Sequence, residues 1–298
     1  MPIDPECQPC LESLVRQVAA LSTELPGLRL EAERAGLRIV GECAGSRTLE
    51  PTHVSTRFLR EIRRITGVAD PFAARKAQEI ALAHAIFSRM SHGETEDLGS
   101  LLRLAVAGNG IDFFRSIHEM EADLGRLPPF AVDHTSRIEE LLLRARKPVV
   151  VLADNAGELV FDLPLLGALA MRGLPLVLGV KGAPSQNDLT LQELGHVAPS
   201  PYPFHVVSSG TDAVGTQLGE VSPAFRGLLE GASLIIAKGM ANFESLRGEE
   251  GLPPVAYCFI AKCAPNARYA GVSKGDRVVL LSEGGVGAWL SPPGDASR

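Results

Sequence analysis

Residues 148–158 read PVVVLADNAGE: a short apolar run that ends abruptly on Asp154 and Asn155. The apolar residues are continuous rather than alternating, which is typical of a parallel strand covered on both faces. Gly157 and Glu158 follow, and an apolar pattern of helical length begins directly after them. The stretch therefore predicts a buried strand that leads through a polar turn into a helix.

Further short apolar runs lie on the C-terminal side of this stretch, at residues 174–180, 203–208, 233–237, 255–261 and 277–281. Helical patterns separate the first of them, at residues 159–171 and 185–194. Such alternation predicts a doubly wound α/β fold, with a mainly parallel sheet and helices on both of its faces. In sheets of this kind, ligands bind beyond the carboxyl ends of the strands.

The N-terminal part of the chain shows apolar residues at helical spacing and no convincing strand. Helices are predicted at residues 71–90 and 97–107. We therefore expect an all-helical domain at residues 1–128 and an α/β metal- and phosphate-binding domain at residues 129–298. Four arginines recur at helical spacing and are interpreted as the solvated face of a helix: Arg57, Arg60, Arg63 and Arg64.

The composition is that of an ordinary globular protein of 298 residues, with 45% hydrophobic and 21% charged residues. A net charge of −6 argues against a broad nucleic-acid surface. No apolar run approaches the roughly 20 residues of a membrane helix, and the first residues do not resemble a secretory signal. Together with the odd number of cysteines, five, these features predict a reduced, cytoplasmic location.

Polar, charged or glycine residues follow nearly every predicted strand, which indicates an active site at the carboxyl edge of the sheet. They include 154–158, Lys181 and Asp188, 209–212, 238–244 and 262–263.

Asp154, Asn155 and Asp188 offer hard oxygen ligands at two of these strand ends. Such ligands suit Mg²⁺ or Mn²⁺, which bridge to substrate phosphate. An alternative remains open, in which Asp154 caps the following helix and Asn155 fills a turn.

Phosphate contacts are predicted from the same strand ends. The helix that begins near Glu158, and a second helix expected after Ser209 and Gly210, would direct free N–H groups at an anion. Lys181, Lys238 and Lys262 each follow a strand, where the ammonium either binds phosphate or is a surface charge. Neither a Walker loop nor a Gly-x-Gly-x-x-Gly string occurs at these positions.

Cys7 and Cys10 form a Cys-x-x-Cys pair at the start of the first predicted helix, a position that favours the thiolate. The pair is compatible with a redox dithiol, with half of a metal site, or with no role.

Several short motifs, in this order, resemble the damage-control phosphatases, formerly the domain of unknown function 89 or acidic-residue methyltransferase-like family. The motifs are Asp154-Asn155-Ala156-Gly157-Glu158, Asn187-Asp188-Leu189-Thr190, Lys238-Gly239-x-x-Asn242-Phe243-Glu244, Asp70-Pro71-Phe72, residues 107–112 and Ala261-Lys262-Cys263. With the Cys-x-x-Cys pair they resemble the prokaryotic branch of the family, over nearly the whole chain.

The resemblance implies a metal-dependent phosphatase that hydrolyses phosphomonoesters of small metabolites, such as sugar phosphates or phosphopantetheine-type compounds. It implies a divalent ion (Mn²⁺, Mg²⁺, Co²⁺ or Ni²⁺) on the catalytic residues Asp154, Asn155 and Asp188. The expected substrate contacts are Asn109, Asp112, Glu158, Ser209, Gly210, Asn242, Glu244 and Lys262. A second metal or redox site is expected at Cys7, Cys10 and Cys263.

Two alternatives remain. One is a carboxyl methyltransferase that uses S-adenosylmethionine, although the single glycine in Asp154–Glu158 makes a poor cradle for that cofactor. The other is a noncatalytic metal- or thiol-binding module, which leaves the charged strand ends unexplained. The expected partner is a small phosphorylated metabolite, with no nucleic acid and no membrane.

Overall fold

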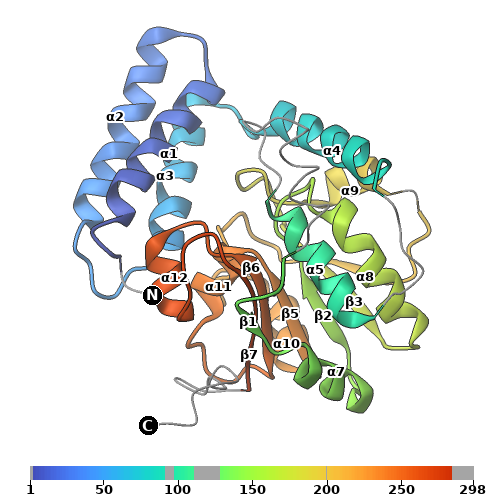
Figure 1. Cartoon of the computed structure of the whole chain (residues 1–298). Coiled ribbons are helices and arrows are strands. Elements are labelled where there is room, and N and C mark those ends of the chain that lie inside the picture. The colour runs from blue at the N-terminus through green and yellow to red at the C-terminus, as the bar shows by residue number, and fades with distance from the viewer. Residues whose placement is uncertain (1–2, 91–96, 111–127, 199, 284–298) are drawn as a thin grey trace.

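The computed structural model describes residues 3–90, 97–110, 128–198 and 200–283. Its centre is a seven-stranded sheet with the order β1-β7-β6-β5-β2-β3-β4 (Figure 1). The strands are β1 (Val132–Asp133), β2 (Val149–Leu152), β3 (Leu176–Val180), β4 (His205–Ser208), β5 (Leu234–Lys238), β6 (Val255–Ile260) and β7 (Arg277–Ser282).

The strands from β4 to β6 are parallel, whereas β7 runs antiparallel to β6 and pairs with the short β1. All six predicted strands are present, and the mainly parallel doubly wound fold is confirmed. The two-residue β1 has too little apolar pattern to be recognised in the sequence.

Helices precede the sheet and alternate with its strands. They are α1 (Cys7–Ser22), α2 (Pro26–Cys43), α3 (Pro51–Thr66), α4 (Ala73–Phe87), α5 (Leu98–Gly108), α7 (Thr135–Arg144), α8 (Leu159–Met171), α9 (Leu191–Val197), α10 (Pro223–Glu230), α11 (Met240–Leu246) and α12 (Ala264–Ala270).

The start of one helix differs from its prediction. Helix α9 begins at Leu191 rather than at residue 185, because Thr190 forms a capping box with Glu193. The residues before Thr190 instead form a turn in which Gln186 has a φ of 49°. Asp188 therefore lies in a connection between strand and helix.

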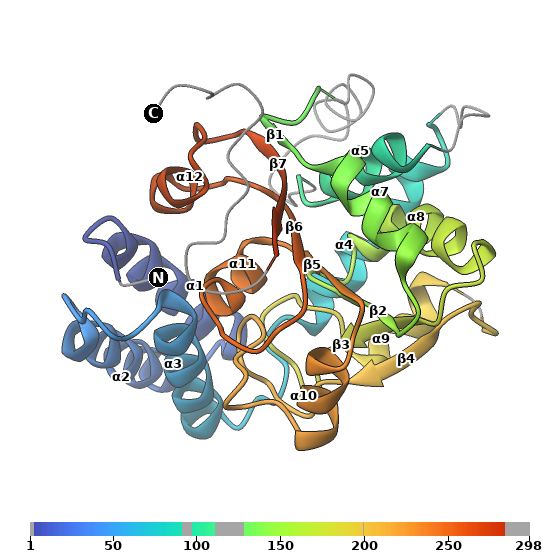
Figure 2. The ribbon, with the colours of Figure 1, turned by 90° about the horizontal axis from the view of Figure 1, so that it is seen from below.

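Alternate residues of strand β2 enter two different hydrophobic cores. Val149 and Val151 face the core shared with α4, α5, α7, α8 and α9. Val150 and Leu152 face the core formed with α10, α11 and α12. Figure 2 shows these two groups of helices on opposite sides of the sheet. Burial on both faces explains why β2 is apolar at every position.

Helices α1, α2 and α3 have a separate hydrophobic core and lie beside α11 and α12 (Figure 1). Helices α4 and α5, in contrast, share the core of the sheet. The predicted division into domains at residue 128 stays a prediction. Among the described helices, none combines the length and the apolar content needed to cross a bilayer.

The direction of winding reverses at β2, because β3 and β4 lie on one side of it and β5 and β6 on the other. In doubly wound sheets this reversal opens a crevice at the carboxyl ends of the strands. Residues Asp154 and Gly239 follow the two strands that flank the reversal, β2 and β5.

Candidate active site

Asp154 is the centre of a group of polar residues at the carboxyl end of β2. Its Oδ2 accepts a hydrogen bond of 2.9 Å from Asn109 Nδ2, at the end of α5. Burial raises the pKa of the Asp154 carboxyl well above its usual range, and the charges of Glu158 and Asp188 raise it further. The positive charges of Lys262 and Lys238 act in the opposite direction.

Asp188 lies next to Asp154 because the two strand ends are joined by backbone hydrogen bonds. Asn155 and Asp188 form an isolated antiparallel bridge, and Leu189 N donates to Asp154 O at 2.9 Å. Burial raises the pKa of Asp188, and Lys181, whose Nζ lies 3.4 Å from Asp188 Oδ2, partly opposes this rise. The structure thus brings Asp154, Asn155 and Asp188 together, as predicted.

Glu158 is buried in the first turn after β2. Its Oε1 accepts hydrogen bonds from Asn109 Nδ2 and Asn155 Nδ2, each of 2.5 Å. Its Oε2 is buried without a hydrogen bond, 3.6 Å from Lys238 Nζ. The side-chain amides of Asn109 and Asn155 therefore each contact both Glu158 and Asp154.

Two of the three lysines predicted to bind phosphate have other partners. Lys238 is fully buried, and its Nζ contacts Asp162 Oδ1 at 2.6 Å and the carbonyl oxygen of Ala105 at 2.9 Å. Lys181 is also buried and is held by backbone carbonyl oxygens and by Asp188. Neither of them is the surface charge of the alternative reading, and phosphate binding by either stays a prediction. Lys262 alone is exposed, and it lies close enough to Asp154 to act on its pKa.

The oxygen donors of the site are compatible with a divalent cation. Asp154 and Asp188 are two buried carboxylates with raised pKa values, so a cation between them would offset a charge that the protein itself compensates only partly. Since Asn155 Nδ2 donates to Glu158, its Oδ1 is the atom left for a ligand. Within the described ranges, no three His, Cys, Asp or Glu side chains are grouped so as to hold a metal. The predicted ligands Asp154, Asn155 and Asp188 differ from such a group, because Asn155 would contribute an amide oxygen.

Two predicted substrate contacts have structural partners, and a third is exposed. Asn242 donates to the carbonyl oxygens of Lys238 at 2.8 Å and Ala153 at 3.3 Å, and so joins the ends of β5 and β2. Ser209 N donates to Val180 O, which continues the pairing of β3 and β4. Gly210 is exposed with a φ of 79°. No helix begins after it, since the next one, α10, starts at Pro223, so the predicted helix N-terminus is wrong.

Glu244 lies with the cysteines. It accepts a 2.6 Å hydrogen bond from Asn266 Nδ2, which also lies 3.2 Å from Cys263 Sγ. Burial raises the pKa of Glu244 to about 7. Burial also raises the pKa of Cys7, to about 11, and that of Cys10, with added effects of the Glu244 and Cys263 charges.

Burial therefore opposes the thiolate character expected of the Cys7–Cys10 pair. The three cysteines and Glu244 are close enough to influence one another, but the described part of the chain contains no metal-holding group of three such side chains. A role for Cys7, Cys10 and Cys263 stays a prediction. Asp112, another predicted contact, lies outside the described residues.

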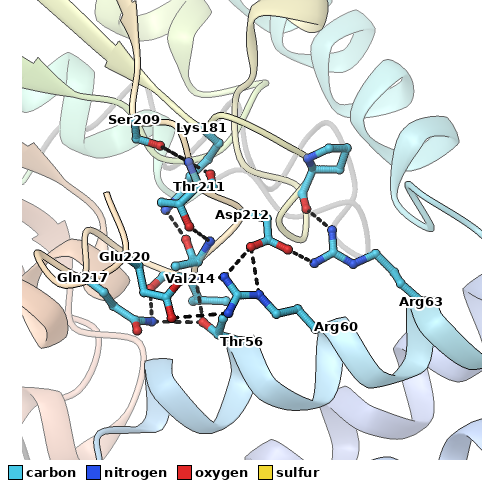
Figure 3. Close-up of polar contacts among 12 residues, drawn as sticks. Thr56, Arg60, Arg63, Lys181, Ser209, Thr211, Asp212, Val214, Gln217 and Glu220 are labelled. Atoms are coloured by element: carbon cyan, nitrogen blue, oxygen red, sulfur yellow. Dashed lines mark hydrogen bonds and ion pairs between the residues drawn. The ribbon is translucent and has the colours of Figure 1, made fainter. Parts of the chain in front are cut away.

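A network of ion pairs that the sequence did not reveal joins helix α3 to the connection after β4 (Figure 3). Arg60 Nη2 lies 2.6 Å from Asp212 Oδ1, and Arg63 pairs with Asp212 Oδ2. The interpretation as a solvated face is thus wrong for Arg63, of whose side chain 17% is exposed, whereas Arg60 and Arg64 have that character, with 41% and 71% of their side chains exposed. The only signal in the sequence was the i, i+3 spacing of Arg60 and Arg63, which does not identify a partner about 150 residues away.

Comparison with known proteins agrees with the motifs. The family model of the damage-control phosphatase ARMT1-like domain matches residues 3–278. A protein from Archaeoglobus fulgidus described as a damage-control phosphatase is 31% identical over 297 residues, which cover 95% of this chain and 100% of the relative. Damage-control phosphatase PH1575 from Pyrococcus horikoshii is 26% identical over 288 residues, which cover 95% and 99%.

A solved structure is also similar. The crystal structure of a DUF89 family protein from Pyrococcus horikoshii aligns with a TM-score of 0.84 and 25% identity, and covers 94% of this chain and 98% of that one. These matches confirm the resemblance drawn from the motifs and the α/β fold.

Proposed function

The chain belongs to the damage-control phosphatase ARMT1-like family, and on that premise we propose that it hydrolyses phosphomonoesters of small metabolites with the help of a divalent cation held by Asp154, Asn155 and Asp188. Sugar phosphates and phosphopantetheine-type compounds are the proposed substrates, and Mn²⁺, Mg²⁺, Co²⁺ and Ni²⁺ are the ions to test. A cytoplasmic location stays a prediction.

The observation that supports this proposal most is the backbone bridge between Asn155 and Asp188. It joins the connections after β2 and β3, so that buried carboxylates from two strands lie side by side at the reversal of the sheet. Structural carboxylates in a protein interior are normally paired with cations. Asp154 has two carboxylates among its neighbours in addition to Lys262 and Lys238, and its pKa remains raised, which is typical of a functional site.

When bound there, a divalent cation supplies positive charge that offsets the negative charge of the phosphoryl oxygens during transfer. The chain's own residues bind and orient the groups around it. Asn109 and Asn155 fix the carboxylates of Asp154 and Glu158 by hydrogen bonds. Lys262, exposed after β6, would bind a phosphate oxygen as a point charge.

Hydrolysis of p-nitrophenyl phosphate tests the proposal. We expect Asp154→Ala to lower kcat/KM at least about 100-fold, since a proposed ligand of the cation that would stabilise transition-state charge is lost. The matched control is Asp133→Ala, at an exposed position on the edge strand β1. Full activity of Asp154→Ala, or of wild-type protein in excess chelator, would overturn the metal role. A thermal-shift comparison of Mn²⁺ with S-adenosylmethionine separates the phosphatase from the methyltransferase alternative.

A further inference from the structure

We propose that Arg63 is a positioning residue for Asp188: from helix α3 it holds the connection that carries this carboxylate. The inference rests on the proposed function, because it concerns a residue proposed to bind the cation. It assigns a role in the site to the N-terminal helices, whose hydrophobic core is separate from that of the sheet.

Arg63 contacts two different connections at the carboxyl edge of the sheet. Its Nη1 donates to the carbonyl oxygen of Pro184 at 2.8 Å, four residues before Asp188. Its Nη2 pairs with Asp212 in the connection that follows β4. Only 17% of the Arg63 side chain and 19% of the Asp212 side chain are exposed, so this pair is far better shielded than a surface ion pair.

The same two connections are joined a second time around Lys181. The Lys181 ammonium donates to the carbonyl oxygens of Ala213, at 2.7 Å, and of Gly215. Its remaining partner is Asp188 Oδ2, at 3.4 Å. Figure 3 shows Arg60 and Arg63 of α3 reaching Asp212 from one side, with Thr211 and Lys181 on its other side. Asp188 is therefore held by Lys181, and the position of Lys181 depends on Ala213 and Gly215, which directly follow Asp212 in the connection after β4.

The backbones of the two connections also approach each other closely. Gly182 N donates to Thr211 O at 2.9 Å, and a Cβ atom at position 182 would lie 2.5 Å from Thr211 N. A shift of one connection is thus transmitted to the other. The guanidinium of Arg63 suits this task because its planar fork directs separate N–H groups at the two acceptors, a fixed geometry that the compact ammonium of a lysine at position 63 would lack.

The test is the charge-conserving variant Arg63→Lys, with Arg60→Lys as its matched control. Arg60 lies on the same helix and also pairs with Asp212, but its other partner is Glu220 in place of the Asp188 connection. We expect Arg63→Lys to weaken Mn²⁺ binding, measured by calorimetry, about 10-fold, at the low end of the range for outer partners of metal ligands. Arg60→Lys should change it less than about 2-fold.

Hydrogen exchange of metal-free protein gives a readout that is independent of activity. Amides of residues 181–190 should exchange faster in Arg63→Lys than in Arg60→Lys, because the Pro184 contact is lost only in the first. Equal metal affinity and equal exchange in the two variants would overturn the inference. If Arg63→Lys does not fold, Asp212→Asn serves in its place, and it should weaken Mn²⁺ binding more than Glu220→Gln. A wild-type protein that neither binds Mn²⁺ nor hydrolyses phosphomonoesters would instead refute the proposed function.

Discussion

Gly239 lies so close to Asp154 that a Cβ atom at position 239 would come within 1.9 Å of Asp154 Oδ2. Its φ of 78° is in the left-handed region, which favours glycine. Position 239 therefore excludes a side chain both by backbone conformation and by lack of space. The turn from β5 to α11 therefore packs directly against the Asp154 carboxylate.

Replacement of this glycine should damage the site more than the fold. We expect Gly239→Ala to displace the Asp154 carboxylate, to lower phosphatase activity at least about 10-fold and to cost about 1 to 3 kcal/mol of stability. Activity assays and chemical denaturation measure the two effects. Gly167→Ala in α8, where a Cβ atom meets nothing within 4 Å, is the control and should stabilise the protein by up to about 1 kcal/mol. Normal activity of Gly239→Ala would contradict the close contact.

The buried lysine should contribute strongly to stability. Lys238→Met leaves Asp162 and Glu158 without their ammonium, and we expect a loss of about 3 to 5 kcal/mol near pH 8. Burial already raises the pKa of Asp162 to about 6, and loss of Lys238 would raise it further. Since the carboxyl then stays protonated at acid pH, the loss should be smaller near pH 5. Urea denaturation at both pH values measures it, and the double variant Lys238→Met/Asp162→Asn should recover part of the loss.

Glu244 should make stability depend on pH. Its pKa in the folded protein, about 7, is higher than its ordinary value of 4.5. The folded state therefore binds this proton more tightly, and stability is lost as the pH rises from about 4.5 to above 7. Glu244→Gln keeps an acceptor for Asn266 and removes this loss.

We expect Glu244→Gln to stabilise the protein by about 1 to 3 kcal/mol near pH 8 and to have little effect near pH 4.5. Thermal denaturation across this range measures the difference. The exposed Glu249→Gln should change stability by less than about 0.5 kcal/mol at any pH. A gain that is independent of pH would show that the carboxylate of Glu244 is not responsible.

The same reasoning predicts that the proposed cation site reduces the stability of metal-free protein. Asp154→Asn removes one charge from neighbouring carboxylates, so we expect its Tm in chelator to exceed that of the wild type, by the equivalent of about 1 to 2 kcal/mol. Added Mn²⁺ should raise the Tm of the wild type, because it binds the folded state, and should have little effect on the variant. Differential scanning calorimetry with and without Mn²⁺ tests both statements, and an unchanged wild-type Tm would contradict them.

The strands and the proximity of Asp154 to Asp188 could be predicted because both follow from local pattern and general topology. A continuous apolar run such as residues 149–152 identifies a covered parallel strand, and parallel strands that are neighbours bring their carboxyl ends together. The residues that follow them must then be close, whatever their side chains do.

The partners of individual charges could not be predicted, because a charged residue after a strand looks the same whether it faces solvent or the interior. Lys238 is the last residue of β5 and Lys262 follows β6, yet the first is fully buried against Asp162 and the second is exposed. Arg63 has the spacing of a surface residue, and its partners at Pro184 and Asp212 are distant in sequence. Such pairings depend on tertiary packing, which local pattern does not contain.

The ion pair between Asp162 and Lys238 also bears on the order in which the protein is assembled during synthesis. Asp162 leaves the ribosome with the first half of the sheet, and its ammonium partner emerges 76 residues later. Any nascent fragment that ends before β5 would have to bury Asp162 without this counter-charge, which is unfavourable. The strands on the N-terminal side of β5 therefore gain their full stability only after residue 238 has been synthesised. The two halves of the sheet must fold together.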